Sequence, residues 1–441
     1  MSTDDGTPGS DRASRSARLT SLDGVRGLAA FVVVLWHAFL LAEPHLIERW
    51  GPQTRAPGGL HWWLFASPLS LLISGEQAVV VFFLLSGIVL TLPVLRADRF
   101  DWWAYYPRRI VRLWLPVVVS VVLAIALLLL VPRASVPVDS WQWRGNAHAV
   151  DVAQAAREAG LVSFAPTING PLWSLSWEMA FSIALPLFVV TALVVRRWWV
   201  VAIVAAVVVV DLGVAWDLSP LKYLPVFLIG AIAATNLDAI MAAGDRIGSR
   251  RLHRLLWWSL FAVSGLVVTA SRISDSVAGP AAALTHVMSA LGIVGCMGLV
   301  FLAVGSVGAR KVLDAKPAQW LGRISFSLYL VHVPLMVTLA YLFGWDRWGM
   351  ASSSGFRRRS RWRRSSRVSS KHPRTVFLVA RADRPPFSIT GGREPGEGQM
   401  RTLSSDPHQV VMRRPCSPTS SVANVSSTSV PPTRGSARPP M

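Results

Sequence analysis

The sequence is short of charged residues and has almost no cysteine. Of its 441 residues, 15% are Asp, Glu, Lys or Arg, whereas 52% are hydrophobic and 20 are Trp. The two cysteines, Cys296 and Cys416, provide neither a disulfide framework nor a cysteine metal site. The alternation typical of membrane β-barrel strands is also missing. These absences exclude a soluble globular protein, and we expect neither a metal ion nor a bound cofactor.

Long apolar blocks take the place of the missing charge. About 20 apolar residues in helical form cross the hydrocarbon core of a bilayer. We therefore predict an all-α fold, a polytopic transmembrane helix bundle with about nine spans and the lipid bilayer as its surroundings. The expected spans are 22–42, 75–95, 110–131, 172–195, 198–216, 220–242, 255–271, 283–305 and 321–343.

Composition divides the chain into three parts. Residues 1–20 are rich in Ser, Asp, Arg and Gly, and we expect them to be disordered and cytoplasmic. Residues 21–344 form the transmembrane domain. The segment 345–441, called the tail below, has 18 Lys and Arg against 5 Asp and Glu and no apolar block of spanning length. Most of the net charge of +20 belongs to the tail, so it gives no reason to expect nucleic acid as a partner.

Basic residues between the spans indicate the orientation. If the N-terminus is cytoplasmic, the inner segments hold 18 Lys and Arg and the outer segments hold 7. Such a bias predicts a multi-pass protein of the cell membrane with a cytoplasmic N-terminus. Nine spans would leave the tail outside, although its cluster Arg357–Arg367 is a cytoplasmic pattern. We predict that the tail is disordered or out of frame; a regulatory tail that binds anionic lipid is the alternative.

Two ionisable residues interrupt the first apolar block. Arg26 and His37 are eleven residues apart, about three turns, which places them on one helical stripe about 16 Å apart. Ionisable residues inside a span are costly and usually face a bundle interior or a wet cavity. Arg26 could instead extend to the interface, and His37 could simply bond a neighbouring helix. Together they favour a functional site.

Later spans supply a carboxylate and a second histidine. Glu178 is expected about two turns below the outer face of the fourth span. His332 is expected near mid-bilayer in the ninth, and Ser325, Tyr329 and His332 form a polar stripe at helical spacing. A histidine can remove a proton from a hydroxyl, and a carboxylate can orient it. Polar bonds between helices are the alternative for both residues.

Arginines at the cytoplasmic ends suggest a phosphate-bearing ligand. Arg109 and Arg112, three residues apart, lie on one side of the third span. Arginine binds phosphate through paired, charge-assisted hydrogen bonds. Ordinary anchoring at the cytoplasmic face is the other reading.

These motifs together resemble the integral-membrane acyltransferase type 3 family, whose members modify sugars and lipids of the cell envelope. Five elements occur in the family's order between about residues 20 and 344. They are Leu22–Ala30 with His37, similar to the Arg-x10-His signature; Val81–Gly87, similar to FFxLSG; Arg109–Leu113 with Pro116, similar to RxxRLxP; Trp173–Glu178 with Pro186, similar to WSLxxE…P; and Leu321–Pro334, similar to SxSxYLxHxP.

The resemblance implies transfer of an acyl group, commonly acetyl from acyl-CoA as cosubstrate, to a hydroxyl of an envelope glycan or lipid-linked acceptor. It assigns catalysis to His37 and Glu178, and binding of donor and substrate to Arg26, Arg109, Arg112 and His332. Met179-Ala-Phe-Ser182 replaces the family's acidic residue and Phe-Tyr pair after the glutamate. The tail stands where a tenth span is usual. The alternatives are a secondary transporter or flippase, against which no internal repeat is visible, and an inactive interaction protein.

Overall fold

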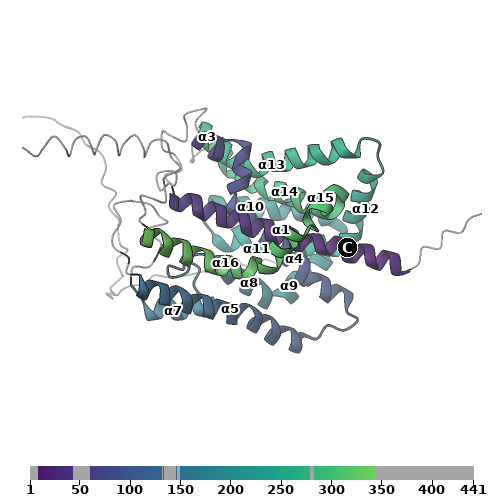
Figure 1. Cartoon of the computed structure of the whole chain (residues 1–441). Coiled ribbons are helices and arrows are strands. Elements are labelled where there is room, and N and C mark those ends of the chain that lie inside the picture. The colour runs from purple at the N-terminus through teal and green to yellow at the C-terminus, as the bar shows by residue number, and fades with distance from the viewer. Residues whose placement is uncertain are drawn as a thin grey trace, which may run out of the picture. The chain divides into compact units, whose positions relative to one another are not determined.

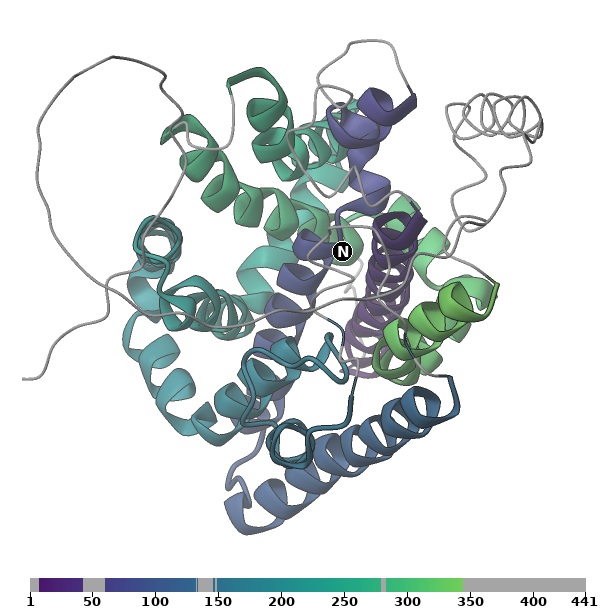
Figure 2. The ribbon, with the colours of Figure 1, turned by 90° about the vertical axis from the view of Figure 1, so that its left-hand side faces the viewer.

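The described part of the chain is entirely helical in its regular structure. The computed structural model describes residues 8–42, 60–131, 133, 146, 149–278 and 283–343, all within the first of two units, Met1–Lys371. Each regular element in these ranges is an α-helix or a 3₁₀-helix (Figures 1 and 2). The predicted all-α fold is confirmed, while the predictions for the tail lie outside the described residues.

Seven helices are long and apolar enough to cross a membrane. Each falls on a predicted span, and α1 begins at Pro8, before the expected start of the first span at residue 22. These helices are α1 (Pro8–Ala42), α4 (Gly75–Arg96), α5 (Trp102–Leu130), α10 (Trp199–Ala215), α13 (His253–Ala278), α14 (Ala283–Gly305) and α16 (Lys316–Phe343).

The other two predicted spans are bent. The span predicted at 172–195 consists of α8 (Leu172–Ile183) and α9 (Leu185–Val194), which meet at 67°. The span predicted at 220–242 consists of α11 (Ser219–Thr235) and α12 (Leu237–Gly248), which meet at 74°. Each pair, counted as one span, is long and apolar enough to cross a membrane, so the described helices provide seven to nine spans.

Local chemistry accounts for both bends. Pro186 lies in the first turn of α9, and its nitrogen has no hydrogen to donate to the carbonyl of Ser182. At the second bend the Asn236 side chain donates to the Ile232 carbonyl at 3.0 Å. This side-chain bond competes with the helical ladder. Sequence reasoning predicted these segments as single spans because their hydropathy continues across the breaks.

Short helices complete the described elements. The short elements are α3 (Leu60–Phe65), η2 (Pro68–Ile73), α7 (Val152–Ala159), η3 (Arg196–Trp198) and α15 (Val307–Leu313).

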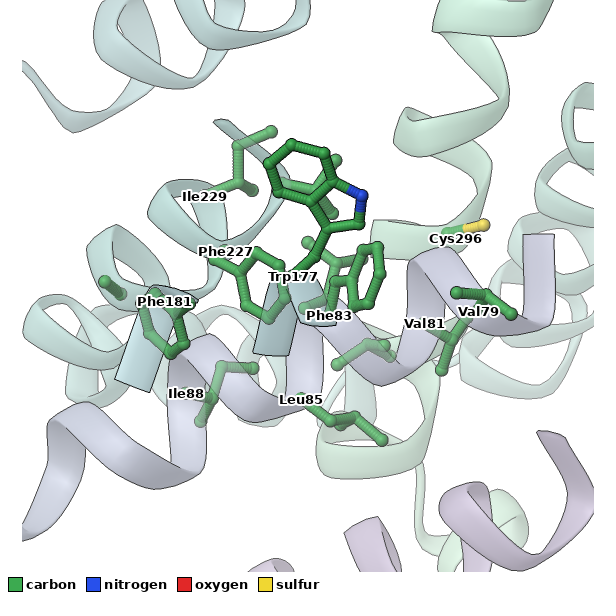
Figure 3. Close-up of a cluster of buried hydrophobic side chains, with 14 of the residues drawn as sticks. Val79, Val81, Phe83, Leu85, Ile88, Trp177, Phe181, Phe227, Ile229 and Cys296 are labelled. Carbon is green, nitrogen blue, oxygen red and sulfur yellow. The ribbon is translucent and has the colours of Figure 1, made fainter. Parts of the chain in front are cut away.

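Helix α4 lies at the centre of the main hydrophobic core and packs against α1, α11 and α14. Phe83 stacks on Phe227 with ring centroids 4.4 Å apart, and Phe227 stacks on Phe181 at 4.5 Å (Figure 3). Gly87 and Gly230 let the two backbones touch, since a Cβ on Gly87 would lie 2.8 Å from the Gly230 Cα. Small residues at such crossings are how membrane helices pack closely.

Helix α1 makes its most extensive contact with α16, and the two run side by side in Figure 1. Gly27 and Gly322 meet at this contact, where a Cβ on Gly27 would come 2.5 Å from the Gly322 backbone nitrogen. The close approach fixes Arg26 and His37 of α1 relative to the polar stripe of α16.

Candidate functional site

Five helices, α1, α4, α5, α8 and α16, enclose a small pocket of about 150 Å³, which we call the arginine pocket. Four residues predicted as site residues from distant parts of the sequence line it together. They are Arg26, Arg109, Arg112 and Glu178. The remaining polar lining consists of Ser86, Ser174, Ser325 and Tyr329.

An ion pair holds the centre of the arginine pocket. Arg109 Nη2 lies 2.6 Å from Glu178 Oε1, with 14% of the arginine and 19% of the glutamate side chain exposed. Ser86 donates to the same carboxylate oxygen at 3.2 Å. Arg109 Nε donates to Ser182 Oγ at 3.1 Å. The guanidinium is therefore held in a single orientation by two side chains of α8.

The bend between α8 and α9 locks α5 in place. Because Pro186 has no N–H, the Ser182 carbonyl lacks its helical donor, and Tyr105 Oη donates to it at 3.2 Å. The Ile183 carbonyl, also at the break, accepts from Tyr106 Oη at 3.1 Å. Buried carbonyls need such partners in the membrane. The two tyrosines thus align α5 so that Arg109, one turn later, reaches Glu178.

Arg26 and Arg112 are less constrained than Arg109. The guanidinium of Arg26 lies 3.6 Å from the Asp23 carboxylate on the same helix. Arg112 is exposed and forms no ion pair with any of the residues that the structure describes. Both guanidinium groups retain donors that an anionic ligand in the arginine pocket could use.

The two histidines form a pair of their own. His37 Nδ1 lies 3.3 Å from His332 Nε2, with ring centroids 4.9 Å apart at an interplanar angle of 71°. His332 Nδ1 faces the carbonyls of Tyr329 at 2.7 Å and Leu328 at 3.2 Å. His37 Nδ1 also faces the Val33 carbonyl at 2.9 Å.

These contacts determine the tautomers of the neutral pair. A nitrogen that faces carbonyl oxygens must carry the hydrogen, so His332 Nδ1 is a donor and its Nε2 an acceptor. His37 Nδ1 faces two acceptors, Val33 O and His332 Nε2, and therefore also carries its hydrogen. The unprotonated nitrogen of His37 is Nε2, and within the described ranges nothing bonds to it. The Nε2 atom of His37 is therefore an unprotonated, basic nitrogen, and the contact of His37 Nδ1 with His332 fixes the orientation of the ring.

Tyr329 links the histidine pair to the arginine pocket. Its hydroxyl lies 2.6 Å from Ser174 Oγ and lines the arginine pocket. Its carbonyl accepts from His332. The predicted stripe of Ser325, Tyr329 and His332 therefore exists, with its first two members in the pocket lining and the third beside His37.

The structure groups the predicted site residues differently from the sequence in two respects. Glu178 was expected near the two histidines, but it lies with the arginines, and its described bonds go to Arg109 and Ser86. His332, expected among the donor-binding residues, contacts His37 and does not line the arginine pocket. Hydropathy estimates depth along a span but does not indicate which neighbour a side chain faces.

Sequence reasoning missed a buried support next to the histidines. Glu158 in α7 is fully buried and accepts from the backbone N–H groups of Thr167, Ile168 and Asn169 at 2.7–2.9 Å. Asn169 then donates to the Leu330 carbonyl at 3.0 Å, two residues from His332. The only signal in the sequence was a glutamate in the connection between the predicted spans 110–131 and 172–195.

Acidic and metal-ligating side chains are sparse in this region. Among the described residues, no group of three or more His, Cys, Asp or Glu side chains could hold a metal ion. The chemistry available at the site is that of an imidazole, a carboxylate, hydroxyls and guanidinium groups.

Comparison with known proteins assigns the family. A family model described as an acyltransferase domain matches residues 19–351, about three quarters of the chain. Neither the curated proteins nor the solved structures contain a significant match. The matched range includes the arginine pocket and the histidine pair, and the helices are those of a multi-pass membrane protein. The chain belongs to the acyltransferase 3 family and is a membrane acyltransferase.

Proposed function

We propose that this acyltransferase moves an acyl group, commonly acetyl, from acyl-CoA to a hydroxyl of an envelope glycan or lipid-linked acceptor. The observation that carries the proposal is the free Nε2 of His37, a basic nitrogen whose ring is fixed by His332. It lies on the same helix as Arg26 of the arginine pocket. A base and an anion-binding site are the two elements that acyl transfer from a phosphorylated thioester requires.

The step follows from these positions. His37 Nε2 removes the proton of the acceptor hydroxyl as its oxygen forms a bond to the thioester carbonyl carbon. The carbon–sulfur bond breaks, and the CoA thiolate leaves and takes up the proton that His37 holds. His332 is a positioning residue, because its Nε2 accepts the hydrogen of His37 Nδ1 and so keeps Nε2 of His37 available.

Donor binding belongs to the arginine pocket. Arg109 is oriented by Glu178 and Ser182, while Arg26 and Arg112 keep free donors for the phosphates of acyl-CoA. We assign Glu178 the role of orienting Arg109, so that it contributes to catalysis through the position of the bound donor. With a cytoplasmic N-terminus, as the loop charges predict, the donor reaches the arginines from the cytoplasm.

The test is acyl transfer by the purified full chain in lipid nanodiscs, with labelled acetyl-CoA and extracted envelope glycans. His37→Gln keeps the size and hydrogen bonding of the side chain but removes its basicity, so turnover should fall at least about 100-fold. Arg196→Gln, an exposed change on η3, is the control and should retain turnover. Normal turnover by His37→Gln at equal expression would contradict the proposal.

Transport in addition to acyl transfer is a second candidate activity, because bent helices that pair up are also found in secondary transporters. The two bends at α8–α9 and α11–α12 are the observation in its favour. Substrate flux in sealed proteoliposomes would support it. Acyl transfer without substrate flux in the same proteoliposomes would exclude it.

A further inference from the structure

A second cavity lies on the other side of α1 and α4 from the arginine pocket. Its volume is about 1060 Å³, against about 150 Å³ for the pocket. Ala29 of α1 and Ala78 of α4 face this cavity, whereas Arg26 and Val79 of the same helices line the arginine pocket. No lining residue is common to both. We call the larger space the α13 cavity.

The wall of the α13 cavity is largely hydrocarbon. Away from its ends, the polar side chains on the wall are those of Ser74, Gln77 and the thiol of Cys296. A wall of this composition favours hydrocarbon over water. The principal apolar lining comes from Leu71, Trp257, Phe261, Val268, Leu299 and Leu302.

The α13 cavity is long and opens toward the bilayer. Its lining extends along α13 from His253 to Val268, fifteen residues, which is about 22 Å of helix. That exceeds one leaflet of a hydrocarbon core about 30 Å thick. Leu72, Trp258 and Phe261 line it with exposed side chains. In a membrane these openings face acyl chains, so an alkyl chain has both access and room.

Charge gathers at one end of the α13 cavity. His253 and Arg254 stand in the first turn of α13, and Lys311 stands on α15. Asp245 of α12 is the acidic residue there. Arg254 and Lys311 are exposed, and neither forms an ion pair with another described residue. The positive charges therefore outnumber the negative charge at this end.

The opposite end has no such charge. Leu71 of η2 contacts α13 there: a Cβ added to Gly265 of α13 would lie only 3.3 Å from a Leu71 methyl group. The α13 cavity is thus amphipathic along its length, with hydrocarbon at one end and basic side chains at the other. This pattern matches a lipid whose headgroup is anionic.

We propose that the α13 cavity binds an anionic phospholipid, with its acyl chains along α13 and its phosphate between Arg254 and Lys311. The predicted orientation puts these two residues at the cytoplasmic leaflet, where anionic lipids are attracted by basic residues near the surface. The bound lipid packs the α13–α14 hairpin against α1 and α4. This site is independent of the acyl-transfer step proposed above.

Native mass spectrometry of the delipidated full chain tests the proposal. Phosphatidylglycerol and phosphatidylcholine with identical chains are titrated separately. One phosphatidylglycerol should bind at saturation, and the Arg254→Gln/Lys311→Gln double variant should bind it about 30-fold more weakly. The estimate takes about 1 kcal/mol for each basic residue near the membrane surface, with tenfold per 1.4 kcal/mol. Phosphatidylcholine should bind the two proteins equally.

The control is Arg196→Gln/Arg197→Gln, which removes two exposed arginines from η3, outside the α13 cavity. It should bind phosphatidylglycerol like the unaltered chain. Leu299→Trp fills the apolar part and should weaken binding while leaving the basic end intact. Equal binding of both lipids, or an equal loss in the control, would overturn the proposal. Displacement of phosphatidylglycerol by long-chain acyl-CoA would overturn it too, because the α13 cavity would then belong to the donor.

Discussion

The arginine pocket and the α13 cavity share α1 and α4 as a wall but use charge in opposite ways. In the pocket, Arg109 and Glu178 are enclosed, paired and oriented by hydroxyl groups. In the α13 cavity, Arg254 and Lys311 stand at one end of an otherwise apolar space. Enclosed, oriented charges suit the precise placement of a reacting molecule. Charges at a rim suit a lipid, which needs only one anchored end.

The largest effect expected from this contrast concerns the removal of one charged side chain at each site. Glu178→Ala leaves Arg109 without its partner, so the free energy of unfolding should fall by about 2–3 kcal/mol. This is below the 3–5 kcal/mol of a fully buried pair, since both side chains are partly exposed. Lys311→Ala, an exposed change at the α13 cavity and the matched loss of one charge there, should cost less than about 0.5 kcal/mol. Thermal unfolding in one detergent measures both, and equal losses would remove the contrast.

Donor binding gives the next effect. Arg109→Lys keeps the charge but cannot bond Glu178 and Ser182 at once through a planar fork. We expect acyl-CoA to bind about tenfold more weakly, which equals about 1.4 kcal/mol. Isothermal titration with a non-hydrolysable acyl-CoA analogue is the measurement. Arg196→Lys is the matched control, and unchanged binding by Arg109→Lys would mean that charge alone matters.

A smaller effect is expected at the bonds from Tyr105 and Tyr106 to the Ser182 and Ile183 carbonyls, which we call the tyrosine lock. Tyr105→Phe removes the donor to the Ser182 carbonyl, which Pro186 cannot replace. An unpaired, partly buried carbonyl should cost about 1 kcal/mol. Trp103→Phe is the control. Trp103 lies in the same helix, two residues before Tyr105, but it is 92% exposed, so its replacement should leave stability unchanged. Chemical unfolding followed by circular dichroism compares the two variants, and an unaffected Tyr105→Phe would show that water satisfies the carbonyl.

The smallest effect lies far from both sites. Lys222 donates to Asp217 at 2.5 Å, and this hydrogen bond holds the pKa of the Asp217 carboxyl below its ordinary value. Any stabilisation would thus exist above about pH 4 and be lost as the pH falls through the lowered pKa. Because Asp217 is fully exposed, solvent screens the pair, and Asp217→Asn should leave the melting temperature unchanged at pH 7. A clear drop would assign the pair a structural role.

Features set by neighbouring residues could be predicted from the sequence, whereas contacts between residues distant in the sequence could not. Apolar length located all nine segments, and helical spacing placed Ser325, Tyr329 and His332 on one stripe, because both are local properties. Pro186 was visible, but the donors that satisfy the carbonyls at the break, Tyr105 and Tyr106, precede Ser182 and Ile183 by 77 residues. Glu178 could have paired with a histidine or an arginine, and only the packing of α5 against α8 decides between them.

The tyrosine lock also sets an order for assembly in the membrane. Tyr105 and Tyr106 precede their carbonyl partners by 77 residues. At about 5–20 residues per second, the ribosome needs roughly 4–15 s to make the intervening chain. During that interval α5 has been made but its lock has no partner. The arginine pocket can therefore form only after α8 and α9 have been synthesised. A truncated chain that ends before Leu172, the first residue of α8, should insert α5 without fixing Arg109.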